Sequence, residues 1–257
     1  MILAIDIGNS NIVIGGVRGE EITFEARLRT ETTKTSDQYC VDLKIILDVY
    51  GVSRDEIEGS IIASVVPQVL NSMQTAVKKL TGKQSMVVGP GLKTGLNIRL
   101  ENPGQTGADL VVGCVAALKQ YQPPMIVVDM GTATTMVVLD ETGALVGGSI
   151  SPGIKISMDA LTDRTALLPG LQLDQPKKVI GRNTIDCMRS GIMYGAAAML
   201  EGMIDRMEEE LGSKTTVVAT GGISRFVLPL CKKEIIYDKD LLIKGLVAIY
   251  YDNLKLK

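Results

Sequence analysis

The sequence predicts an α/β protein made of two similar halves. The first observation is an internal echo: segments 3–10 and 126–133 both run apolar, Asp, apolar, Gly and then polar. The second is that each segment is followed by two more short apolar strands. The third is that helical periodicity then takes over in both halves. At 257 residues the chain is long enough for two lobes with buried cores.

The first half is expected to place three strands before its helices. Ser36-Asp-Gln and Pro67 are both signals for the start of a helix. The apolar positions expected on the first helix are Val41, Ile45, Ile46 and Val49. The elements expected in this half are strands at 3–7, 12–16 and 22–24, a helix from 36, a strand at 61–66, a helix at 67–80 and a strand at 86–88.

The second half repeats this order after a loop rich in Gly and Pro at 89–106. The elements expected there are a helix at 106–121, strands at 126–129, 136–139 and 144–146, helices at 154–166 and 184–211, a strand at 216–219 and a helix at 240–251. We therefore expect an N-terminal lobe at 1–105 and a C-terminal lobe at 106–257, with the helix at 106–121 on the boundary.

The composition points to a cytoplasmic globular protein with a small-molecule partner. Apolar residues make up 46% of the chain and charged residues 22%, which are ordinary values for a folded protein. A formal charge of -2 offers no general attraction for nucleic acid or for a membrane surface, so we expect neither as a partner. The sequence shows no secretory signal and no long apolar run.

The lack of histidine and of closely spaced cysteines limits the catalytic and metal-binding chemistry expected of the chain. There is no histidine, so acid-base work falls to carboxylates. The four cysteines form no CxxC pair, which argues against a zinc site or a disulfide framework and favours buried reduced thiols.

The repeated strand end is suited to binding phosphate. An Asp at the tip of a strand can hold hydrated Mg²⁺, and the following Gly lets the N–H groups of the turn approach a phosphate. Asp6 is the candidate for the Mg²⁺ role, and Asp129 is its counterpart in the second half. An ordinary hairpin also explains a single Asp-x-Gly, but two copies followed by Thr220-Gly-Gly222 favour a nucleotide site. There the bare backbone of Gly221 and Gly222 would admit adenine or ribose.

Together these motifs resemble the type III pantothenate kinases, within the superfamily of acetate kinase, sugar kinases, Hsp70 and actin. The motifs in the family's order are Asp6-Ile-Gly-Asn-Ser10, Gly107-Ala-Asp109, Asp129-Met-Gly-Thr-Ala-Thr-Thr135, Gly147-Gly-Ser-Ile-Ser-Pro-Gly153, Asn183-Thr184, Ser190-Gly191 and Thr220-Gly-Gly222. The resemblance implies two duplicated ribonuclease H-like, actin-like lobes, each a mixed sheet flanked by helices. It also implies phosphorylation of pantothenate to 4'-phosphopantothenate, the first step of coenzyme A synthesis, by a homodimer that uses ATP, Mg²⁺ and K⁺ or NH₄⁺.

The resemblance also implies roles for individual residues. It assigns ATP binding to Asp6, Ile7, Gly8, Asn9, Ser10, Asn11, Ile12, Val13 and Thr132. It assigns pantothenate binding to Leu100, Gly107, Ala108, Asp109, Leu110 and Thr184. Asp129 would bind the monovalent cation, and Asp109 would be the catalytic base. A helix start at Asp109 is expected to keep the pKa of its carboxyl low, and capping of that helix is the alternative role.

Two positions depart from the family pattern, which usually has Arg where this chain has Leu110 and commonly has Tyr where it has Leu100. Both changes fall on the acceptor side. They keep two alternatives open, namely a kinase of another hydroxylated acceptor and a noncatalytic nucleotide-binding regulator. Lys119, Arg99 and Arg164 are the cations considered as replacements for the missing Arg.

The long apolar helix at 184–211 allows two interpretations, a dimer interface or an ordinary central helix. Its apolar residues are Ile185, Met188, Ile192, Met193, Ala196, Ala197, Ala198 and Met203.

Overall fold

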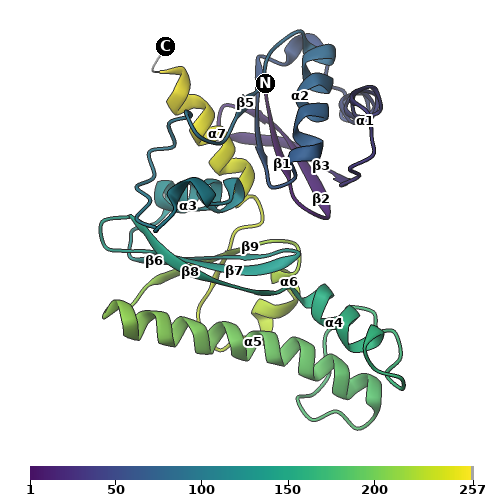
Figure 1. The fold of residues 1–257 in the computed structure, drawn as a ribbon, viewed down its shortest axis with the longest axis vertical. Coiled ribbons are helices and arrows are strands. Elements are labelled where there is room, and N and C mark those ends of the chain that lie inside the picture. The colour runs from purple at the N-terminus through teal and green to yellow at the C-terminus, as the bar shows by residue number, and fades with distance from the viewer. Residues whose placement is uncertain (256–257) are drawn as a thin grey trace. The chain divides into compact units, whose positions relative to one another are not determined.

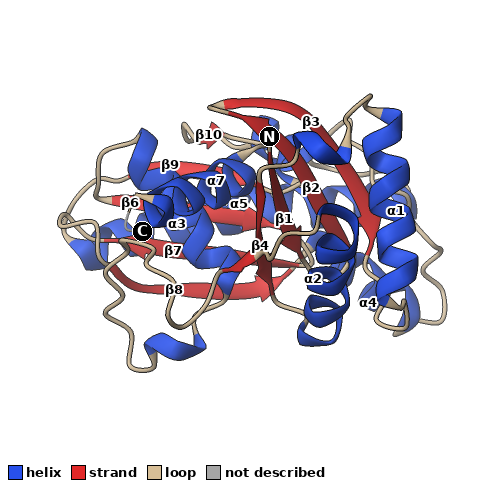
Figure 2. Ribbon diagram, turned by 90° about the horizontal axis from the view of Figure 1, so that it is seen from above, coloured by secondary structure: helices blue, strands red, loops and turns tan. Residues whose placement is uncertain are grey.

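The computed structural model describes residues 1–255 and contains two compact units. The first consists of Met1–Leu96, Glu101–Lys119 and the residues from Asp240 on, and the second consists of Asn97–Leu100 and Gln120–Lys239. Each unit contains one five-stranded sheet with helices packed on it (Figures 1 and 2). The expected α/β class with two mixed sheets is confirmed. The expected lobe boundary at residue 106 stays a prediction, since helices from both sides of it pack with the first sheet.

The first sheet has the strand order β3-β2-β1-β4-β5. Strands β1, β2 and β3 are antiparallel neighbours, whereas β1, β4 and β5 run parallel. The elements of this unit are β1 Ile2–Ile7, β2 Asn11–Arg18, β3 Glu21–Arg29, α1 Ser36–Val49, β4 Gly59–Ser64, α2 Pro67–Thr81, β5 Met86–Val87, α3 Ala108–Gln120 and α7 Leu241–Leu254, with 3₁₀ turns at Arg54–Glu56 and Pro103–Gln105.

Helices α1 and α2 bury one face of this sheet (Figure 1). The expected apolar face of α1 is largely wrong, because Val41, Ile45 and Val49 are exposed. The buried residues of α1 are Tyr39, Leu43, Ile46 and Leu47. Both sets repeat at helical spacing, so periodicity alone could not choose between them. The helix is also capped one residue earlier than expected, by a capping box at Thr35.

The other face of the first sheet is covered by α7, which contacts β1, β2 and β4. Two glycines let α7 lie close to α3 and to β4. A side chain at Gly245 would collide with the carbonyl oxygen of Val112 on α3, and one at Gly59 would collide with the ring of Tyr250. A Lys119–Asp252 ion pair of 2.9 Å joins the ends of α3 and α7.

The second sheet has the order β10-β9-β6-β7-β8, which repeats the first sheet strand for strand. Strands β6, β7 and β8 are antiparallel neighbours, and β6, β9 and β10 run parallel. The elements are β6 Met125–Met130, β7 Ala133–Leu139, β8 Leu145–Pro152, α4 Ile154–Asp163, α5 Thr184–Leu211, β9 Thr216–Thr220, α6 Ser224–Val227 and β10 Ile236–Tyr237, with a 3₁₀ turn at Leu228–Leu230. The internal echo therefore marks a true structural duplication.

Helix α5 runs along one face of the second sheet (Figure 1). Met193, Ala197, Leu200 and Ile204 bury their side chains in the core of this unit, as an ordinary central helix would. The helix ends at Gly212, whose φ of 75° is the left-handed C-cap conformation that glycine favours. None of the helices within residues 1–255 combines the length and apolar character needed to cross a bilayer.

The cysteines are all free thiols, in agreement with the absence of a disulfide pattern. Burial was expected for all four, but Cys187 is exposed. Cys114 is fully buried on α3, and this burial raises the pKa of its thiol to about 12.

The burial pattern of α1 predicts how two substitutions on one helix differ. Leu43→Ala removes a side chain that is 1% exposed, so it should lower the free energy of unfolding by about 2 to 5 kcal/mol. Ile45→Ala removes a side chain that is 55% exposed and should change it by no more than roughly 0.5 kcal/mol. Chemical denaturation measures both. Equal losses would contradict the buried face described here.

Candidate active site

The turn after β1 carries the first of the two sequences expected to bind phosphate and is closed by its own backbone. The N–H of Gly8 donates to the carbonyl of Asn11 at 3.0 Å. Thr30 at the end of β3 holds this turn from outside, since its hydroxyl donates to Gly8 O at 2.6 Å and its N–H donates to Ser10 O at 3.0 Å. Asp6 lies just before the turn, where β1 ends.

The turn after β6 repeats this arrangement with one residue fewer. The N–H of Gly131 donates to the carbonyl of Ala133 at 3.0 Å. The end of β8 packs against it, because Gly153 N–H donates to Thr132 O at 3.1 Å. A side chain at Gly153 would collide with this same oxygen, so glycine is required for the approach.

A row of side chains crosses the second sheet beside Asp129. Asp129 is paired with Thr135 on β7 and with Thr220 on β9, and Thr135 is paired with Ile150 on β8. Paired residues point to the same face of a sheet. The core residues next to them in sequence, such as Val128 and Met136, face α5, so this row lies on the opposite face.

Gly221 brings backbone close to the Asp129 carboxylate. Its φ is +93°, and a Cβ there would lie 2.6 Å from Asp129 Oδ1 and 2.6 Å from Met130 O. Glycine is thus required twice, for conformation and for space. The structure therefore brings Asp129, Gly221 and the Thr132 turn together within one unit, with Gly222 next in the chain.

Asp109 lies in the first turn of α3 and its side chain is partly buried. Its Oδ1 accepts a hydrogen bond from the Leu110 N–H at 2.8 Å, and a Cβ at Gly107 would lie only 2.5 Å from this oxygen. The expectation of a low pKa is wrong: burial raises the pKa of Asp109 above its usual value, and the backbone hydrogen bonds from Leu110 and Asp109 itself only partly oppose this. The carboxylate is therefore a better base than a solvated one.

The remaining acceptor-side positions are spread over both units. Ala108 and Leu110 lie beside Asp109, and both are partly buried. Leu100 follows a short stretch that joins the edge of the second sheet, where Arg99 N–H donates to Leu145 O at 2.8 Å. Thr184 is the exposed first residue of α5, immediately after the Asn183 cap.

The cations considered as replacements for an Arg at position 110 have other surroundings. Arg99 forms an ion pair of 3.1 Å with Asp140, and Lys119 forms its pair with Asp252 on α7. Arg164 is exposed where α4 ends.

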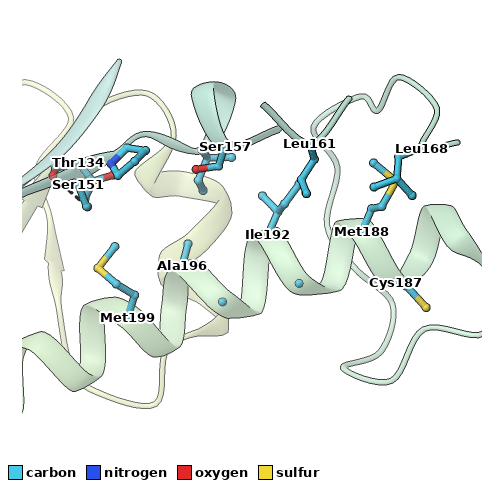
Figure 3. Close-up of a pocket in the computed structure, with 14 residues that line it drawn as sticks. Thr134, Ser151, Ser157, Leu161, Leu168, Cys187, Met188, Ile192, Ala196 and Met199 are labelled. Carbon is cyan, nitrogen blue, oxygen red and sulfur yellow. Dashed lines mark hydrogen bonds between the residues drawn. The ribbon is translucent and has the colours of Figure 1, made fainter. Parts of the chain in front are cut away.

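Sequence reasoning did not find a half-open cavity of about 600 Å³ within the second unit. Figure 3 shows Ile192, Ala196 and Met199 of α5 on one side of it and Ser151, Ser157 and Leu161 on the other. The hydroxyls of Ser151 and Ser157 are satisfied by the carbonyls of Thr134 and Gly153. The signal available in the sequence was the apolar surplus of α5, but the partner elements could not be known without the tertiary structure.

The fold has relatives of known structure. A Campylobacter jejuni protein of the Baf family aligns with a TM-score of 0.63 at 18% identity, with 98% of this chain and 99% of that chain covered. The component A of (R)-2-hydroxyglutaryl-CoA dehydratase from Acidaminococcus fermentans aligns with a TM-score of 0.60 at 15% identity, covering 99% and 98%. At such identities the likeness establishes the actin-like fold alone.

Comparison of sequences identifies the family, whereas the structural likeness identifies only the fold. The profile of the family described as type III pantothenate kinase matches residues 2–206. The type III pantothenate kinase of Moorella thermoacetica is 44% identical over 253 residues, 98% of this chain and 100% of that protein. That of an Exiguobacterium species is also 44% identical, over 99% of this chain and 100% of its own length. With the duplicated acidic turns in the same chain, these matches establish that it belongs to the type III pantothenate kinase family.

Proposed function

We propose that this chain transfers a phosphoryl group from ATP to pantothenate, giving 4'-phosphopantothenate for coenzyme A synthesis. The observation that carries the proposal is the 44% identity to type III pantothenate kinases over nearly the whole of both chains. The duplicated turns after β1 and β6 supply the phosphate-binding chemistry that such a reaction needs. A cytoplasmic location, expected from the sequence, stays a prediction.

On the nucleotide side, the turn from Asp6 to Val13 binds the phosphates with its backbone N–H groups, and Thr132 contacts ATP from the second turn. Gly221 and Gly222 leave room for the nucleoside. Mg²⁺ is commonly held by one or two carboxylates, here Asp6, together with phosphate oxygens and water. When bound, Mg²⁺ neutralises the charge that develops on the transferred phosphoryl group.

On the acceptor side, residues 107–110, Leu100 and Thr184 bind pantothenate, and Asp109 accepts the proton of its hydroxyl. The raised pKa of Asp109 favours this role. In a loose phosphoryl-transfer transition state the proton leaves late, so a carboxylate that also orients the hydroxyl suffices. The monovalent cation is assigned to Asp129, with the polar row across the second sheet beside it.

We also propose that the chain forms a homodimer. The support is the cavity of about 600 Å³ in the second unit, which Met188, Ile192 and Met199 of α5 line on one side. Sedimentation velocity across a range of concentrations should give the mass of two chains. A single chain at every concentration would contradict this proposal and leave the kinase assignment untouched.

The proposed reaction is tested by coupling ADP release to NADH oxidation. ADP release should depend on pantothenate, Mg²⁺ and K⁺, and the product should be 4'-phosphopantothenate by mass spectrometry. A panel of other hydroxylated acceptors serves as the comparison, because Leu100 and Leu110 make the acceptor side more apolar. Faster turnover of another acceptor would replace pantothenate as the substrate. ATP binding without transfer to any acceptor would favour a regulatory role.

Asp109→Asn tests the base while keeping an oxygen that accepts from the Leu110 N–H. Turnover should fall by roughly 10² to 10⁴-fold. In the unsubstituted protein, kcat/KM should fall with decreasing pH through a pKa above that of an ordinary Asp, because the base must be deprotonated.

The same substitution should lower turnover without lowering the stability of the fold at neutral pH. A folded-state pKa above the unfolded value means that the charged carboxylate destabilises the fold at neutral pH. Asp109→Asn should therefore unfold no more easily than the unsubstituted protein at pH 7, and any advantage should shrink as the pH falls through the folded-state pKa. A large loss of stability would instead identify Asp109 as a helix cap.

Leu110→Arg tests the acceptor anchor. A charge-assisted hydrogen bond to the pantothenate carboxylate contributes about 1.5 to 3 kcal/mol, so KM for pantothenate should fall by roughly ten- to a hundred-fold. Leu110→Met is the matched control, since it changes shape slightly and adds no charge. An unchanged KM in Leu110→Arg would show that the acceptor carboxylate is held elsewhere.

A further inference from the structure

One buried polar atom on the nucleotide side of the second unit has no hydrogen-bond partner. It is Oγ1 of Thr135, on β7, which finds neither donor nor acceptor among the described residues. A buried hydroxyl left without a partner destabilises a fold, so a bound ion, a water or another ligand is the expected partner of this one.

The position of this hydroxyl points to that group. Thr135 is directly paired with Asp129, on the face of the sheet opposite to α5. The Cβ atoms of directly paired residues lie about 4.5 to 5.5 Å apart, a distance that lets one small cation contact both side chains. Thr220 flanks Asp129 on its other side.

The first unit provides an internal comparison. There the equivalent carboxylate, Asp6, is paired with Val13 on β2 and with Ala63 on β4. The two apolar neighbours offer no side-chain oxygen, so water and phosphate are the expected sources of further ligands for a cation at Asp6. This suits Mg²⁺, which keeps much of its water. Hydroxyls beside Asp129 suit a weakly hydrated monovalent cation, whose water can be replaced by neutral protein oxygens.

We propose that the Thr135 hydroxyl is a ligand of the monovalent cation assigned to Asp129. The inference rests on the proposed function for the existence of that cation site. The hydroxyl contributes a neutral oxygen beside the carboxylate of Asp129.

Thr135→Val tests the proposal, because valine keeps the branched shape and removes the oxygen. The melting temperature is measured as KCl replaces choline chloride at constant ionic strength, with and without ADP, since a ligand that binds only the folded state stabilises it. The K⁺ concentration that gives half of the shift should rise at least ten-fold in Thr135→Val. Thr135→Ser should restore it, and Thr134→Val, on the opposite face of the same strand, should leave it unchanged.

Two results would overturn the proposal. One is an unchanged K⁺ midpoint in Thr135→Val; if ADP also binds more weakly to this variant, the hydroxyl is assigned to the nucleotide instead. The other is the absence of any effect of K⁺ on the melting temperature of the unsubstituted protein, with or without ADP. If the unsubstituted protein responds to K⁺ yet transfers no phosphate to pantothenate, the proposed function fails while the cation ligand stands.

Discussion

Each sheet depends on the same constraint, a central strand that must end in a closed turn. Strands β1 and β6 have an antiparallel neighbour on one side and a parallel neighbour on the other, so their register is fixed from both sides. The turn is closed by the N–H of Gly8 in one unit and of Gly131 in the other. Because strand residues alternate between faces, fixing the register also directs Asp6 away from the core under α1 and α2, and Asp129 away from the core under α5.

The duplication preserves this constraint while the chemistry around it diverges. The turn after β6 is one residue shorter, and β7 and β9 provide Thr135 and Thr220 where β2 and β4 provide Val13 and Ala63. The backbone thus places a carboxylate at the same position of both sheets, with different side chains beside it.

The features that could be predicted from the sequence were local ones, such as the bounds of helices and the positions of hairpins. The bounds of α5 were predicted correctly at both ends, and the structure shows caps there at Asn183 and Gly212. The hairpins were located because their turns repeat. The buried face of α1 was not predictable, since two apolar stripes shared the helical period and tertiary contacts alone selected Tyr39 and Leu43.

The same reason limited the prediction of the site. The carboxylates could be named from their place at strand ends, but their cross-strand neighbours depend on the register. The pKa of Asp109 was misjudged because the position of a residue on its helix is visible in the sequence, whereas its burial is not. The cavity beside α5 was missed because its walls come from segments far apart in the chain.

Leu110 links the base to the recognition of the acceptor. Burial is the main cause that raises the pKa of Asp109, and the backbone hydrogen bonds from Leu110 and from Asp109 itself lower it. An arginine at position 110 would place a positive charge next to this carboxylate and hold its pKa down. With leucine at this position, burial remains the dominant influence on the pKa of Asp109, the residue proposed as the base.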